Sequence, residues 1–190
     1  MDARQQRTRT ALSKAILKLA ATRPVTEITV SELAAEAGIN RSTFYEHSDS
    51  PVALLRSTLR EELDVIRDRH LIDPTDISVA ITDTTRDVLI HVESHEAIYA
   101  RGLALDENAG ELHSMLSAQF KQTTRRLLDD GEIILPESAN PELLSATVPR
   151  YIADGTVGAI EAWLRRPAPR SHDAFLATYR VVLPDWWPIK

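Results

Sequence analysis

The strongest constraint on the fold comes from residues 27–47, EITVSELAAEAGINRSTFYEH, which read as two short helices joined by a tight turn. Thr29 and Glu32 have the T-x-x-E spacing in which the hydroxyl and the carboxylate each cap a free backbone NH, so a helix is expected to begin there. Its apolar stripe comprises Val30, Leu33, Ala34 and Ala37. Gly38 follows at once, and glycine most readily adopts the left-handed conformation that ends a helix. The first helix should therefore stop there.

The second helix is expected to begin after Asn40, a favourable N-cap residue. Its first turn contains Arg41, Ser42 and Thr43, and Phe44 is expected to turn inward as its anchor. Arginine can bind a guanine edge or a phosphate through two hydrogen bonds, and short hydroxyl side chains can approach both closely. The two helix starts are about a dozen residues apart, the separation found in a helix-turn-helix that reads DNA. The alternative is an ordinary helical hairpin whose polar residues face water.

The distribution of charge favours the DNA-binding interpretation. Residues 1–25 contain six basic side chains and one acidic side chain, Asp2. Residues 1–60 contain nine basic and six acidic side chains, a net charge of +3, so residues 61–190 carry −9 within the total of −6. A basic N-terminal third followed by an acidic remainder is typical of a DNA-binding head attached to a body with another role.

The string TVSELAAEAGINRSTFYEH, the amphipathic helix before it and the helix start SPVALL after it resemble the TetR family of transcriptional regulators. The resemblance covers about the first third of the chain. It implies an N-terminal three-helix domain that binds operator DNA and a helical C-terminal domain that binds a small ligand and forms a dimer. Ser48 stands where the family usually has an aromatic or aliphatic residue, and Pro51 where it often has a lysine that contacts a phosphate. One DNA-backbone contact of the family is therefore expected to be missing.

The DNA-binding candidates follow from these positions. Base-edge contacts are expected from Ser31, Arg41, Ser42 and Thr43, and phosphate contacts from Thr29, Tyr45 and His47. We divide the chain into a head (residues 1–50), a connecting helix (residues 51–67) and a body (residues 68–190). The body is expected to bind the effector and to form the dimer.

Hydrophobic periodicity predicts an all-α fold of about nine helices. Besides the two described, helices are expected at residues 5–21, 51–67, 75–93, 95–105, 107–130, 140–164 and 172–182. No strand-like alternation or internal repeat competes with this interpretation. The chain has no cysteine, which excludes disulfides and thiol chemistry, and it shows neither a secretory signal nor a membrane span. A cytoplasmic location is expected.

Residues 143–164 are apolar almost all round, because only three of their side chains are charged. A helix of this kind must be buried on several sides, so part of it is expected to meet a second subunit. The resemblance implies a homodimer through a four-helix bundle of residues 141–164 and 172–183, with two heads that read a palindromic operator. The interface candidates are Tyr151, Gly155, Gly158, Ala159, Ala162, Phe175 and Tyr179. The alternative is that these apolar faces complete a monomeric core.

The resemblance also implies an effector cavity among the helices of residues 75–166. The candidate lining residues, each of which would otherwise belong to the core, are His91, Tyr99, His113, Phe120, Tyr151 and Trp163. His91 and His95 have the i, i+4 spacing of a metal-binding pair, but Ser94 is expected to cap a new helix there and break their shared face. We therefore predict no metal and no cofactor. No phosphate-binding glycine loop, nucleophile motif or general-base constellation is present, so no catalytic residue is predicted.

The sequence thus predicts a dimeric one-component transcriptional regulator, not an enzyme, of the repressor type that is most common in the family. A small molecule bound by the body would change its affinity for a palindromic operator. One alternative is a helical DNA-binding protein controlled by a partner protein, which a filled core in the body would favour over a cavity. Another is a helical-bundle enzyme or metal-binding protein, but the paired inward carboxylates and Glu-x-x-His spacing of such bundles are not found.

Overall fold

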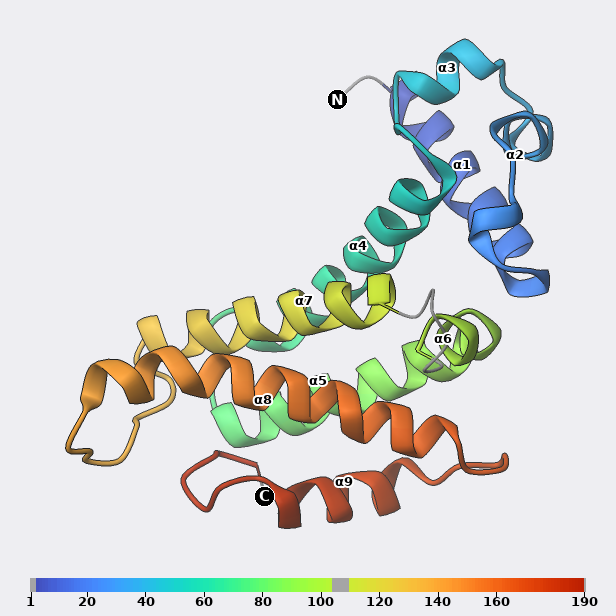
Figure 1. The fold of residues 1–190 in the computed structure, drawn as a ribbon. Helices are drawn as coiled ribbons and strands as arrows, with labels where there is room; N and C mark the ends of the chain where they lie inside the picture. The colour runs from blue at the N-terminus through green and yellow to red at the C-terminus, as the bar shows by residue number, and fades with distance from the viewer. Residues whose placement is uncertain (1–2, 104–109, 190) are drawn as a thin grey trace.

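The computed structural model describes residues 3–103 and 110–189, and this part of the chain is helical throughout. Nine α-helices and one short 3-10 helix follow one another along the described residues, with no strand among them, which confirms the all-α prediction. Figure 1 shows a small head at one end, a larger body at the other, and α4 running between them. No helix among the described residues is long and apolar enough to cross a membrane.

The head contains three α-helices and a short connector. They are α1 (Ala3–Thr22), the 3-10 helix η1 (Val25–Glu27), α2 (Val30–Ala37) and α3 (Arg41–Tyr45). All three α-helices contribute to its core, in which four side chains have 0% exposure: Leu12, Ile16, Leu33 and Phe44. Phe44 is therefore the inward anchor that the sequence predicted.

The ends of the two short helices follow the local sequence signals. Thr29 and Glu32 form the predicted capping box, with Glu32 N donating to Thr29 Oγ1 at 3.2 Å and Thr29 N donating to Glu32 Oε2 at 3.0 Å. Gly38 ends α2 in the left-handed conformation, with a φ of 67°. Asn40 occupies the predicted N-cap position of α3, but its side chain makes no capping hydrogen bond. A helix as short as α3 is not stable alone, so its position depends on packing.

The connecting helix, α4 (Pro51–Leu71), is four residues longer than predicted and packs on both the head and the body. On the head side, Thr58 Oγ1 donates to Ser13 Oγ of α1 at 3.3 Å. On the body side, His70 Nε2 lies 2.9 Å from Asp87 Oδ2. One continuous helix therefore carries contacts with both the head and the body.

The body consists of α5 (Ile77–Ser94), α6 (Glu96–Gly102), α7 (Gly110–Asp129), α8 (Pro141–Leu164) and α9 (His172–Val182). Helices α7 and α8 form its most extensive pair, and α5 packs against α4 on one side and α9 on another. The bounds match the predicted ranges to within a few residues. The predicted helix end at residue 105 and helix start at residue 107 lie outside the described residues.

Candidate nucleic-acid interface and ligand cavity

The predicted DNA-binding residues lie on α2, on α3 and in the segments beside them (Figure 1). Ser31, Arg41 and Ser42 are exposed, and within the described residues their side chains form no hydrogen bond or ion pair. Tyr45 is 55% exposed, with its ring edge against Phe44. Thr43 and His47 are partly buried. The first turn of α3 therefore presents donors to solvent that the protein itself does not use.

Thr29 differs from the other candidates because its hydroxyl serves α2. Its Oγ1 accepts from Glu32 N and donates to Glu32 Oε2 at 2.8 Å. The backbone and side-chain hydrogen bonds from Thr29, together with Arg23, lower the pKa of the Glu32 carboxyl to about 2. A phosphate contact from Thr29 stays a prediction, and the structure gives this residue a capping role in addition.

Several cations counted in the head are already paired with acids, which sequence counting does not reveal. The pairs are Arg9–Glu61, Lys18–Glu36 and Arg23–Glu32. Arg41, by contrast, has no acidic partner among the described residues. The cation on α3 is therefore available to an anion outside the protein.

The two departures from the TetR pattern form a capped turn between α3 and α4. Ser48 Oγ donates to Ser50 O at 3.1 Å, and Ser50 Oγ accepts from Ala53 N at 3.1 Å. Pro51 is the first residue of α4, where its missing NH has no cost. Ser48 and Ser50 thus stabilise the turn, and Pro51 supplies no cation for a phosphate.

A cavity of about 1140 Å³ lies between the head and the body, bounded by α1, η1, α4, α6 and α7. Four arginines line it: Arg23 from the head, Arg56 and Arg60 from α4, and Arg101 from α6. Arg23 is paired with Glu32, and Arg101 donates to the Ala20 carbonyl. Arg56 and Arg60 form no ion pair within the described residues. Leucine, isoleucine and methionine side chains from α4, α6 and α7 supply an apolar part of the wall.

None of the six predicted effector residues is among the described residues that line this cavity, and apart from one pair they occupy different places in the body. His91 and Tyr99 are the exception, since His91 Nε2 lies 2.9 Å from the buried Tyr99 hydroxyl. The others are scattered: His113 pairs with Glu161 of α8, Phe120 lines a second cavity of about 80 Å³, Trp163 packs under Arg170, and Tyr151 is 60% exposed. The sequence signal favoured aromatic and histidine side chains, whereas this cavity is lined by arginine. Their effector roles stay predictions.

The structure places His91 and His95 together, contrary to our expectation about Ser94. Ser94 is the last residue of α5 and its hydroxyl bonds back to His91 O at 2.8 Å, so it does not cap α6. His95 follows directly, and its ring centroid lies 4.8 Å from that of His91. Glu62 of α4 reaches both rings, with its Oε2 2.9 Å from His95 Nε2 and 3.4 Å from His91 Nδ1. The hydrogen bond from His95 lowers the pKa of Glu62, and burial lowers the pKa of His91 to about 4.

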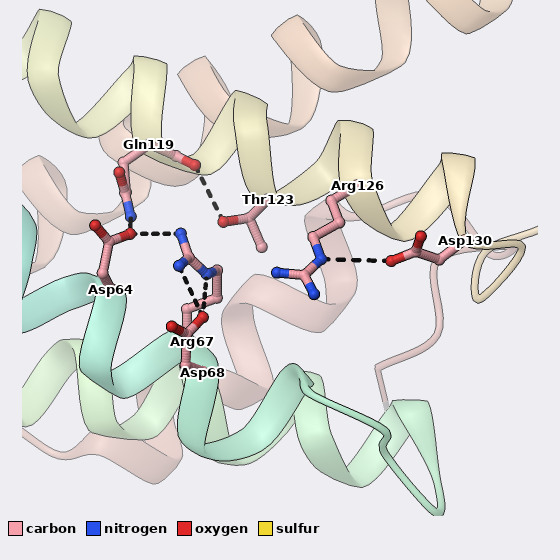
Figure 2. Close-up of polar contacts among 7 residues, drawn as sticks. All are labelled: Asp64, Arg67, Asp68, Gln119, Thr123, Arg126 and Asp130. Atoms are coloured by element: carbon pink, nitrogen blue, oxygen red, sulfur yellow. Dashed lines mark hydrogen bonds and ion pairs between the residues drawn. The ribbon is translucent and has the colours of Figure 1, made fainter.

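A polar network joins α4 to α7 beside the large cavity (Figure 2). Gln119 of α7 is buried and donates to Asp64 Oδ1 at 2.5 Å. The same carboxylate accepts from Arg67, which also pairs with Asp68 at 2.7 Å. Because Gln119 lines the cavity, a molecule bound there would lie next to this link to α4.

One face of α8 is exposed to solvent, and α9 also exposes apolar side chains. The exposed residues are Leu143, Tyr151, Gly155, Gly158 and Ala162 of α8, and Val181 and Val182 of α9. A Cβ added at Gly155 or Gly158 would meet no described atom within 4 Å. Ala159 is only partly exposed. Phe175 and Tyr179, which we expected at the interface, do not lie on this face, because they pack inside the chain against Trp163 and Thr156.

No family model and no curated protein sequence matches the chain. Solved structures match it over nearly its whole length. A TetR transcriptional regulator from Streptococcus agalactiae has a TM-score of 0.66 and 19% identity, covering 95% of both chains. The dihydroxyacetone kinase operon activator DhaS has a TM-score of 0.61 and 15% identity, covering 92% of this chain and 97% of its own. NalD is the secondary repressor of the MexAB-OprM multidrug efflux pump in Pseudomonas aeruginosa. It has a TM-score of 0.60 and 20% identity, and the match covers 96% of this chain and 98% of NalD. The chain has the fold of TetR transcriptional regulators.

Proposed function

We propose that this protein is a dimeric transcriptional regulator that binds a palindromic operator and responds to a small-molecule effector. The observation that carries the proposal is the first turn of α3, where Arg41 and Ser42 are exposed and unpaired among the described residues while Phe44 holds the helix from behind. Exposed donors on a buried anchor are what direct reading of base edges requires. The fold supports the same conclusion, since the similar solved structures are transcriptional regulators.

The effector we propose is an anion with an apolar portion, bound in the cavity between head and body. Arg56 and Arg60 supply unpaired cations there, and Glu111 is the one acidic residue among the described lining residues. Guanidinium groups match carboxylate and phosphate geometry, and the apolar wall suits a hydrocarbon part. A ligand that favours one position of α4 relative to α7 would shift the heads, with a coupling of about 1–3 kcal/mol.

Selection of bound DNA from a random pool tests the head. We expect enrichment of a sequence with two-fold symmetry and half-sites about 34–36 Å apart, or a multiple of that distance. A pool that stays random after repeated rounds would contradict operator binding. Screening carboxylates and phosphate esters against the resulting complex then tests the body.

Replacing Arg60 with alanine is expected to weaken binding of an anionic effector about 10- to 150-fold, the loss of one charge-assisted hydrogen bond. Operator affinity without effector should not change, because Arg60 lies on α4 and outside the predicted DNA contacts. Arg69→Ala is the matched control, since Arg69 is on the same helix but pairs with Asp87 away from the cavity. Calorimetric titration measures the effector affinity and the operator affinity of each variant. Equal losses in the two variants would place the effector elsewhere.

Gly158→Arg is expected to convert the dimer into a monomer. A Cβ at position 158 would meet no described atom of the same chain within 4 Å, so the arginine causes no clash in the protomer. Arginine also favours a helix over glycine by roughly 1 kcal/mol, so the protomer should stay folded. A long cation on the α8 face would instead prevent close approach of a second copy. Sedimentation velocity measures the change, with Ala97→Arg, at an exposed position of α6, as the control. A wild-type monomer, or a variant that remains dimeric, would contradict the proposed interface.

Repression is the mode of regulation that we propose, with effector binding lowering operator occupancy. The similar structures include both an activator, DhaS, and a repressor, NalD, so the sign needs its own test. A reporter gene under the selected operator should be silenced by the protein and restored by the effector. Control by a partner protein is the second candidate, and the volume of the cavity favours the small molecule over it.

A further inference from the structure

Three side chains of metal-binding type meet where α4 packs on the α5–α6 junction. Glu62 comes from α4, His91 from the last turn of α5, and His95 from the junction itself. Their ligand atoms all lie within 4.8 Å of one another, and no second group of this kind occurs in the described part of the chain. Glu62 precedes the two histidines by 29 and 33 positions, and the fold brings it next to both of them.

The distances among these atoms suit one metal ion. Donor atoms bound to a tetrahedral Zn²⁺ at about 2.0–2.2 Å lie about 3.3–3.6 Å apart, and two imidazoles with one carboxylate are a common zinc donor set. Glu62 Oε2 is already 3.4 Å from His91 Nδ1 and 2.9 Å from His95 Nε2. The widest separation among the three ligand atoms, 4.8 Å, would have to shorten by about 1.3 Å for all three to bind one ion. A fourth coordination position would remain for water, and the Glu62 side chain is 39% exposed to solvent.

The surroundings of His91 orient it as a ligand. Its Nε2 lies 2.9 Å from the hydroxyl of Tyr99, which is fully buried. When Nε2–H donates to that hydroxyl, the lone pair of Nδ1 faces Glu62, so two acceptors meet where a cation would satisfy both. Metal-bound histidines commonly have their second nitrogen fixed by such a partner. An ion pair between Glu62 and His95 alone would not require His91 beside it or Tyr99 to orient His91.

We propose that Glu62, His91 and His95 bind a divalent transition-metal ion such as Zn²⁺, and that the ion ties α4 to the α5–α6 junction. The first part is independent of the proposed function. The second part rests on it, because α4 carries the head, and an ion that fixes α4 in the body would change operator affinity.

Metal binding is tested on the full chain, free of any polyhistidine tag and treated with a chelator. Titration with Co²⁺ should produce the visible absorption of a low-symmetry N/O site, with one equivalent per chain, and Zn²⁺ should displace it. Glu62→Gln and His95→Ala should each weaken binding at least about tenfold, and Tyr99→Phe about 10- to 100-fold. His70→Ala is the matched control, because His70 and Asp87 also join α4 to α5, but without a second imidazole. Absence of one-to-one binding, or binding that survives His95→Ala, would overturn the site.

The link to DNA is measured separately, by operator affinity with and without Zn²⁺. We expect wild type to respond to the ion and His95→Ala not to respond. Binding of the ion with unchanged operator affinity would overturn the tie between the ion and the head. Failure to bind any DNA, with cobalt absorption intact, would contradict the proposed function and leave the metal site supported.

Discussion

Replacing Phe44 with alanine is expected to lower the free energy of unfolding of the head by about 3–5 kcal/mol, the cost of truncating a buried phenylalanine. Phe44 has 0% exposure, and it is the one buried residue of the five-residue helix α3. Without it, α3 has little else to hold it against α1 and α2, so operator binding should be lost. Urea unfolding followed by circular dichroism and an operator titration measure the two effects.

Tyr45→Ala is the control for this prediction. Tyr45 is the next residue of the same helix and is 55% exposed, so its removal should change stability by less than about 1 kcal/mol. Operator affinity should still fall if Tyr45 contacts a phosphate as predicted. A Phe44→Ala protein as stable as the wild type would show that α3 is held by contacts other than its anchor.

Arg41→Ala is expected to cost about 1–3 kcal/mol of binding free energy at each half-site, or about 5- to 150-fold in affinity, and to relax base preference there. The reason is that Arg41 is exposed and has no acidic partner among the described residues. Lys18→Ala should have a smaller effect, because Lys18 is engaged with Glu36 at 2.6 Å. Titrations on the selected operator and on single-base variants measure both.

The pattern across sequences decides what Arg41 does. If affinity falls only where one base pair is the preferred one, Arg41 reads that base. A uniform loss on all sequences, with the salt slope reduced by about one, would instead identify a phosphate contact. No loss at all would contradict the placement of α3 at the DNA.

The sequence predicted the parts of this structure that depend on near neighbours in the chain. The Thr29–Glu32 capping box, the left-handed Gly38 and the start of α4 at Pro51 all involve residues within a few positions of one another. Such signals set the ends of helices, so the number and order of helices were predictable. Phe44 was identified as a core residue for a similar reason, since it is the large apolar side chain of its short helix.

The contacts between distant residues were not predictable in the same way. The interpretation of Ser94 as a cap hid the neighbourhood of His91 and His95, and nothing in the sequence placed Glu62 beside them. Phe175 and Tyr179 belong to a helix with apolar residues on more than one face, and periodicity does not say which face meets the chain's own core. The arginine-lined cavity arises from the way the head, α4 and α7 pack, which local patterns do not specify.

Helix α4 also determines where the protein can be divided. Its Leu54, Leu55 and Leu59 are buried, and Thr58 and Glu61 contact α1, so the first ten or so residues of α4 complete the head. A fragment cut at residue 50, our sequence-based boundary, would leave the apolar side of α1 exposed. Chimeric regulators that exchange heads should therefore be joined inside α4, beyond residue 61, where the helix passes from one core to the other.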